Sequence, residues 1–113
     1  MTFYLISFPS GEMQLGEGGI EEASIDSHQV IRDAKDAGVY VFGGGINESV
    51  PPVRVAADGT VEEGTYAQTA HLEGGYTVLN LPDRAAAEEW AARIAKACRC
   101  RQELREFMFD PES

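Results

Sequence analysis

Four side chains that can move protons or hold a polar ligand lie close together between Glu63 and Glu73. Tyr66, His71 and Glu73 stand in the loop sequence TYAQTAHLEGG, and Glu63 lies just before it. An imidazole exchanges protons near neutral pH, and a phenol can donate a hydrogen bond to a developing oxyanion. Because loops held between strands often carry ligand contacts, we predict catalytic roles for Tyr66 and His71. Glu63 and Glu73 are predicted to bind the substrate.

Two further candidates lie outside this loop. Arg54 is on the polar side of a predicted strand, where a guanidinium can bind a substrate carboxylate. His28 is on the flank of a predicted helix and is the third predicted catalytic residue. Asp33 and Asp36 do not have the three- or four-residue spacing of an intrahelical partner, so a carboxylate for His28 must come from elsewhere. The alternative is that these residues have no functional role and only pack in loops or form surface ion pairs.

The elements that must position these residues follow a regular order. Alternating and helical apolar spacing predicts a strand, a helix, a strand, a hairpin, a strand, a helix and a strand. The predicted ranges are 3–8, 21–37, 39–42, 53–61 with its turn at Asp58-Gly59, 76–81, 83–98 and 102–109. This order predicts an α+β fold in which two helices cover one face of an antiparallel sheet. The predicted site is a pocket between the sheet and the helices.

The first and last predicted strands carry large apolar residues on both faces. Two helices can cover only one of these faces, and soluble monomers rarely expose a large apolar surface. We therefore expect a homodimer in which two sheets pack face to face about a two-fold axis.

Length and charge narrow the classes of partner. The chain has 113 residues, 43% of them hydrophobic and 25% charged, which is typical of one globular domain spanning residues 1–113. Its formal net charge of -10 repels phosphate backbones and anionic lipid, so we predict no nucleic-acid and no membrane partner. The apolar run in the first ten residues lacks a basic region and alternates like a strand, which indicates a cytoplasmic protein.

Neither the cysteines nor the glycine triplet predicts a cofactor. Cys98 and Cys100 are too close for a comfortable disulfide and lack companion ligands at zinc-site spacing, so no metal is predicted. They are interpreted as small side chains where a helix gives way to a strand. The triplet at 43–45 follows a strand but is not followed by the helix N-terminus that a phosphate loop needs.

Several segments together resemble the YciI-related, DGPF-motif proteins. The resemblance covers residues 37–109 and rests on AGVYVFGGGI, VRVAADG, LEGGYTVLNLPDRAAAEEWAARI and RQELREFMF. It implies a ferredoxin-like, dimeric α+β barrel, and it places His28 where some relatives carry a histidine proposed to work with an aspartate. The family's Asp-Gly-Pro-Phe motif reads Glu63-Gly64-Thr65-Tyr66 here, so only the glycine is retained.

Two classes of function remain open at this stage. The first is a small dimeric enzyme or binder of a small polar or aromatic molecule. The second is a non-catalytic protein-interaction module, because YciI-like domains also occur attached to transcription sigma factors. An acidic surface favours basic protein partners for such a module. A metal-dependent enzyme ranks third, since the histidines and acids have no recognisable ligand spacing.

Overall fold

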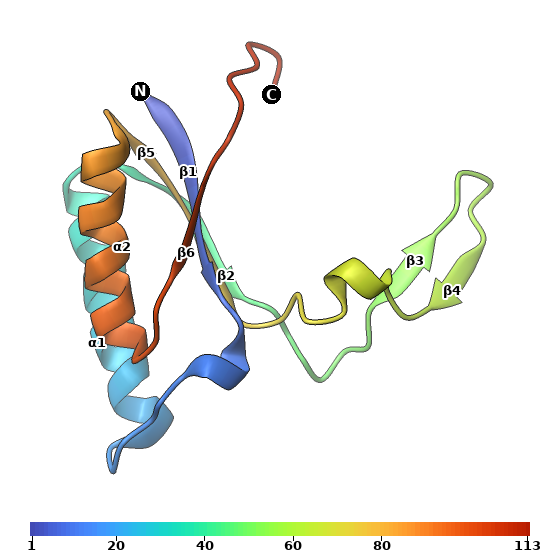
Figure 1. The fold of residues 1–113 in the computed structure, drawn as a ribbon, viewed down its shortest axis with the longest axis horizontal. Helices are drawn as coiled ribbons and strands as arrows, with labels where there is room; N and C mark the ends of the chain where they lie inside the picture. Colours follow the sequence, from blue (N-terminus) through green and yellow to red (C-terminus); the bar gives the residue numbers. More distant parts are fainter.

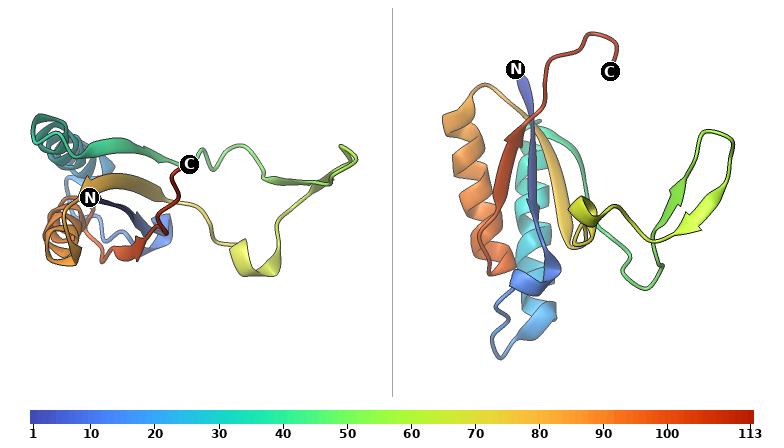
Figure 2. Two further views of the ribbon diagram at one scale, coloured as in Figure 1. Left: turned by 90° about the horizontal axis from the view of Figure 1, so that it is seen from above. Right: turned by 45° about the vertical axis from the view of Figure 1, so that its right-hand side comes forward.

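A four-stranded antiparallel sheet and two helices form the body of the protein (Figure 1). The computed structural model describes all of residues 1–113. The body comprises β1 (Thr2–Phe8), α1 (Gly19–Asp36), β2 (Tyr40–Gly45), β5 (Gly75–Leu81), α2 (Arg84–Cys98) and β6 (Glu103–Glu106). The strand order β2-β5-β1-β6 is that of a ferredoxin-like fold, which confirms the predicted fold class. Both helices cover the same face of the sheet (Figure 2).

The core lies between this helix-covered face and the helices. Tyr4 and Ile6 of β1 are opposite Leu79 and Thr77 of β5, and the first three of these side chains are at most 2% exposed. Alternate residues of the same strands point the other way, because the side-chain period of a strand is two. Phe3 is therefore on the uncovered face and is 45% exposed.

Helix α2 begins and ends where the sequence places it. The Asp83 carboxylate accepts a hydrogen bond of 2.9 Å from the backbone N–H of Ala86, so Asp83 is the predicted N-cap. Five residues of one stripe, from Ala87 to Cys98, are buried. Arg99 closes the helix in the left-handed region at φ 58°.

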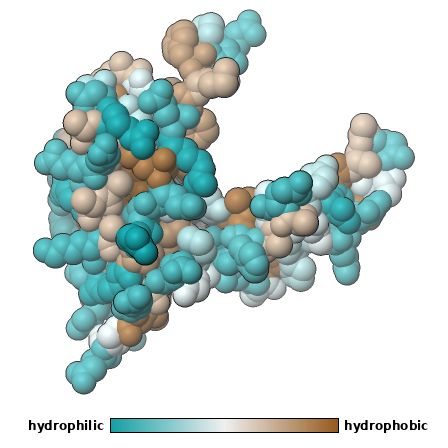
Figure 3. All heavy atoms as spheres, in the orientation of Figure 1, coloured by the Kyte–Doolittle hydropathy of each residue, from teal (hydrophilic) through white to brown (hydrophobic).

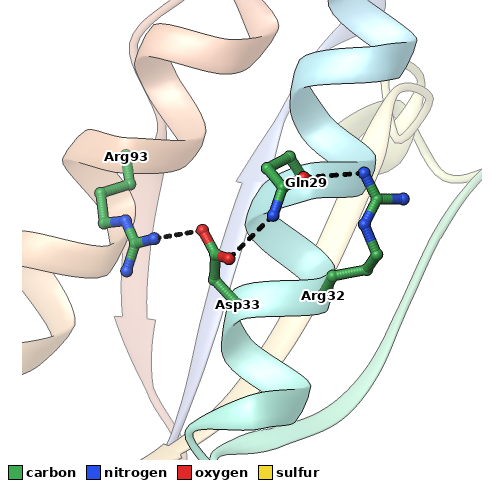
Figure 4. A network of polar contacts seen from close by, with 4 residues as sticks. All are labelled: Gln29, Arg32, Asp33 and Arg93. Atoms are coloured by element: carbon green, nitrogen blue, oxygen red, sulfur yellow. Dashed lines mark hydrogen bonds and ion pairs between the residues drawn. The ribbon is translucent and has the colours of Figure 1, made fainter.

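A polar network holds α1 against α2 (Figure 4). Arg93 of α2 donates to Asp33 of α1 at 2.6 Å. The second carboxylate oxygen of Asp33 accepts from Gln29 at 2.9 Å, and Arg32 donates to the Gln29 carbonyl oxygen at 2.9 Å. The network includes Gln29, the residue that follows His28 along α1.

The predicted hairpin forms, but it does not join the main sheet. β3 (Val53–Val55) and β4 (Val61–Glu63) pair only with each other and form a separate two-stranded sheet. Its turn has Gly59 at φ 90° and a hydrogen bond of 2.9 Å from the Thr60 N–H to Asp58. We call residues 47–66 the arm. It extends away from the body on the side of the sheet opposite the helices (Figures 1 and 2).

Two strand boundaries differ from the prediction. β2 continues through all three glycines to Gly45, because their backbones pair with β5. β6 ends at Glu106, although the Phe107 N–H still donates to the Phe3 carbonyl at 2.9 Å. Met108 and Phe109, which were predicted to lie within the strand, are 92% and 88% exposed.

Two short 3₁₀ turns complete the chain, η1 (Ser10–Glu12) after β1 and η2 (Ala67–Thr69) between the arm and β5. Neither helix of the body is long and apolar enough to span a bilayer.

Candidate functional site

A cavity of about 400 Å³ lies between α1 and the end of the sheet where β2 and β5 meet. It is bounded by α1, α2, the start of η1 and the segment that follows β2. Fourteen of its 24 lining residues are hydrophobic, so it suits a ligand with an apolar body. The apolar lining includes Phe8, Met13, Ile20, Ile31, Tyr40 and Trp90.

Glycines leave room on the sheet side of this cavity. Gly45 is paired with Gly75, and both face the helix side of the sheet. A Cβ atom on Gly75 would lie 2.5 Å from the Phe8 ring, so that ring already covers it. A Cβ atom on Gly45 would meet nothing closer than a backbone oxygen at 3.5 Å. The space beside Gly45 therefore exists because β2 ends without side chains.

Helix α1 presents a polar edge to the same space. Ser24, Ser27 and His28 line the cavity. The Ser27 hydroxyl donates to the Ser24 carbonyl at 3.0 Å, which satisfies it within the helix. His28 is exposed, and its ring makes no hydrogen bond or ion pair with any other residue, so it is free to meet a ligand.

One carboxylate and no lysine or arginine lines the cavity. Glu48, in the segment after β2, accepts a hydrogen bond of 3.1 Å from the Ser10 hydroxyl. This contact ties the segment after β2 to the segment after β1 at the mouth of the cavity. The electrostatic character of the lining is therefore neutral to negative, which adds to the net charge of -10.

The cysteine in the lining is not a nucleophile. Cys98 is 6% exposed, and burial raises the pKa of its thiol to about 11. Burial also raises the pKa of the half-buried Cys100 thiol. Both cysteines are free, and Cys98 remains a protonated, apolar part of the wall near neutral pH.

Two of the predicted residues, His71 and Glu73, lie on the opposite face of the sheet. A depression of about 440 Å³ there is bounded by η2, β1, β5 and β6. His71 Nδ1 is 4.0 Å from Glu73 Oε1, and the His71 side chain is 90% exposed. Tyr76 and Arg105 also line the depression. Burial, with a smaller contribution from Glu73, raises the pKa of the Tyr76 phenol.

The remaining predicted residues belong to the arm. Arg54 pairs with Glu62 at 3.4 Å across the hairpin, with 43% of its side chain exposed. Glu63 lies at the end of β4 and is exposed. Tyr66 precedes η2 and is 68% exposed. The structure therefore distributes the six candidates over three regions of one chain, and only His28 lines the pocket between sheet and helices.

Several lining residues were missed by sequence reasoning, although some left a signal. Ile20, Ser24, Ser27 and Ile31 recur at helical spacing around His28, which marks a single face of α1. Glu48 left no such signal, because its position depends on how the segment after β2 turns. No cluster of three His, Cys, Asp or Glu side chains has a geometry that could hold a metal ion.

No known family model matches the chain, and no curated protein matches it.

Proposed function

We propose that this protein binds a small molecule with an apolar, flat body in the cavity beneath α1. The observation that carries the proposal is a mostly apolar space of about 400 Å³ with a few polar groups at its edge. Ligand sites of soluble proteins have this character, and their volumes begin at about 300 Å³. The aromatic rings of Phe8, Tyr40 and Trp90 supply surfaces against which a planar ligand can lie.

The charges around the cavity determine which polar group the ligand can carry. A carboxylate or phosphate would meet the Glu48 carboxylate, and no lysine or arginine lines the cavity to compensate it. An amine or a hydroxyl can instead interact with the Glu48 carboxylate and with the hydroxyl groups on α1. The favoured class is therefore an aromatic amine or alcohol, and acidic ligands are disfavoured.

His28 is the group in this site suited to proton exchange with the ligand. Its ring has no protein partner, and imidazoles take up and release protons near neutral pH. The proposed role of His28 is thus to hold the polar end of the ligand and to exchange a proton with it. Any reaction on a bound ligand would use this imidazole.

The proposal includes membership of the YciI-related family and a cytoplasmic location. The first is supported by the segments quoted above and by the ferredoxin-like order of the strands. The second is supported by the two free thiols, which a reducing compartment preserves.

A homodimer joined through the uncovered sheet face is also part of the proposal. We call this surface the open face; its large apolar members are Phe3, Val41, Phe42 and Phe107, which are 45 to 68% exposed. The alternative use of the open face is to bind a different, basic protein, in keeping with the acidic surface. The salt dependence of binding distinguishes the homodimer from a complex with a basic protein. Added salt weakens binding to a basic partner and strengthens association between two acidic chains.

The ligand proposal is tested with three probes of one shape, 2-phenylethylamine, 2-phenylethanol and phenylacetate. Binding is followed by chemical-shift changes in ¹H–¹⁵N spectra. We expect the amine and the alcohol to shift resonances of the lining residues, and phenylacetate to bind about tenfold more weakly than the amine, a difference of about 1.4 kcal/mol. His28→Gln is expected to weaken binding of all three.

Two neighbouring glycines provide a test variant and a control variant. Gly45→Val places a side chain in the cavity, whereas Gly44→Ala places a methyl group on the other face, where its nearest neighbour is a Phe42 ring atom at 3.9 Å. Loss of binding in Gly45→Val and its retention in Gly44→Ala support the site. Equal binding by both variants, or no shifts with any probe, would contradict it.

A further inference from the structure

The structure exposes far more surface than a folded monomer of its size. Its accessible area is 8093 Å², whereas monomers of 12.3 kDa average about 6,100 Å², so the excess is about 2,000 Å². Its radius of gyration is 15.7 Å, against about 13 Å for a compact chain of this length. Figure 3 shows why: the arm and the C-terminal tail stand away from the body, with an open recess between them.

The arm has one mainly apolar face and one charged face. Val53, Val55 and Val61 share the first face and are 51 to 66% exposed, and Glu63, opposite Val53, lies at its end. Arg54 and Glu62 form an ion pair on the other face. An isolated two-stranded hairpin is marginally stable in water, and nothing in this chain covers the three valines. The amphipathic pattern therefore matches a hairpin that lies on an apolar surface.

The chain itself carries such a surface. The open face presents Phe3, Val41, Phe42 and Phe107, and it lies on the side of the sheet toward which the arm extends (Figure 2). The arm of one chain projects outward and does not reach its own open face. A second copy placed over that face lies within reach of the arm.

We propose that two copies clasp each other reciprocally, with the valine face of each arm packed on the open face of the other. This inference rests on the proposed homodimer and adds its contact. The excess of about 2,000 Å² on each chain corresponds to about 4,000 Å² for the pair, which is within the range of obligate homodimers. Two-fold symmetry covers both unpartnered surfaces of both chains at once.

The clasp also completes the depression that contains His71 and Glu73. In one chain this depression is open and the His71 side chain is 90% exposed. Because the depression lies on the side that the second copy covers, the partner supplies its missing wall. The His71 and Glu73 pair then belongs to an enclosed site at the interface between the two copies, which the single chain does not form.

The test is sedimentation velocity on two double variants of the full chain. Val55→Gln/Val61→Gln changes a cross-strand pair on the valine face, and Arg54→Gln/Glu62→Gln changes the adjacent pair on the charged face. Both introduce two glutamines and leave the net charge unchanged. We expect the dimer dissociation constant to rise at least tenfold in the first variant and less than threefold in the second.

Mixing experiments test whether the arm contacts the partner's open face. Phe42→Gln weakens the open face and leaves the arm intact, so a mixture with Val55→Gln/Val61→Gln restores one of the two clasps. We expect the mixture to dimerise more tightly than either variant alone. A wild-type monomer at all concentrations overturns the homodimer and the clasp together. A dimer unaffected by the valine variant, or a mixture no tighter than its components, overturns the clasp alone.

Discussion

The two faces of the central sheet differ in whether the chain's own helices cover them. On the helix side, Leu79 and Leu81 are at most 1% exposed, and a cavity has formed within a single chain. On the open side, Phe3 and Phe42 come from the same sheet and are 45% and 68% exposed. The same strands thus supply one face that the chain's own helices cover and another that the chain leaves uncovered. The comparison separates residues that stabilise the protomer from residues that we propose to stabilise the assembly.

The largest expected effect on stability comes from one of two alanine substitutions in β5, at adjacent residues that point to opposite faces of the sheet. Leu79→Ala removes a fully buried side chain and should lower the free energy of unfolding by about 3 kcal/mol at any protein concentration. Val78→Ala changes the open face and should act mainly on the dissociation constant of the dimer. Denaturant unfolding at several protein concentrations distinguishes the two. Equal, concentration-independent losses would mean that the faces do not differ as described.

A pH titration of the wild type and of a Cys98 variant examines the helix side. The Cys98 thiol has a pKa near 11 in the folded protein, against an ordinary value of 9.0. The unfolded chain therefore ionises first, so this stabilisation is intact below about pH 9 and is lost as the pH rises toward 11. The expected loss is about 2 kcal/mol in the free energy of unfolding. Cys98→Ala should flatten this dependence, and an unchanged slope in that variant would assign the loss to other groups.

The polar network between α1 and α2 is expected to contribute less to stability. Arg93→Ala removes the contact with Asp33 and should cost about 1 kcal/mol, because both side chains are about two-fifths exposed and solvent screens the pair. The loss should also weaken ligand binding, since the network holds α1, which carries His28, against α2. Arg84→Ala, which removes an exposed pair with Glu88 at 3.9 Å, is the matched control and should cost less than about 0.5 kcal/mol. Thermal unfolding and the phenylethylamine titration measure both effects.

Among the variants designed to weaken binding, the smallest expected effect on stability is that of Gly45→Val. Gly45→Val introduces a β-branched residue into a strand where its Cβ meets no atom closer than 3.5 Å. It should change the free energy of unfolding by less than about 1 kcal/mol while abolishing ligand binding. Destabilisation beyond about 2 kcal/mol would show that the cavity is too tight to accept a side chain, and therefore a ligand, at this position.

Most of the fold could be predicted from local sequence patterns. The distribution of the predicted site residues over three regions could not. Asp83 as a cap, the turn at Asp58-Gly59 and the two-faced strands are all local properties. The sequence of the hairpin does not say whether its strands join the main sheet, because alternation specifies a strand and not its neighbour. His71 and Arg54 were therefore expected to converge with His28, although they belong to three different regions.

The central claim is that the helix-side cavity functions within one chain while the open face requires a second copy. The two histidines report on it directly, because His28 lines the cavity and His71 lines the depression on the open face. The measurement follows their imidazole Cε1–H signals in ¹H–¹³C spectra, assigned with His28→Gln and His71→Gln. Wild-type protein and the variant Val55→Gln/Val61→Gln are compared with and without 2-phenylethylamine.

We predict that the amine shifts the His28 signal in both proteins and leaves the His71 signal in place. The arm variant should shift the His71 signal and leave that of His28 unchanged. A His71 signal that follows the amine, or a His28 signal that follows the arm variant, would contradict the division of the sheet into a ligand face and an assembly face.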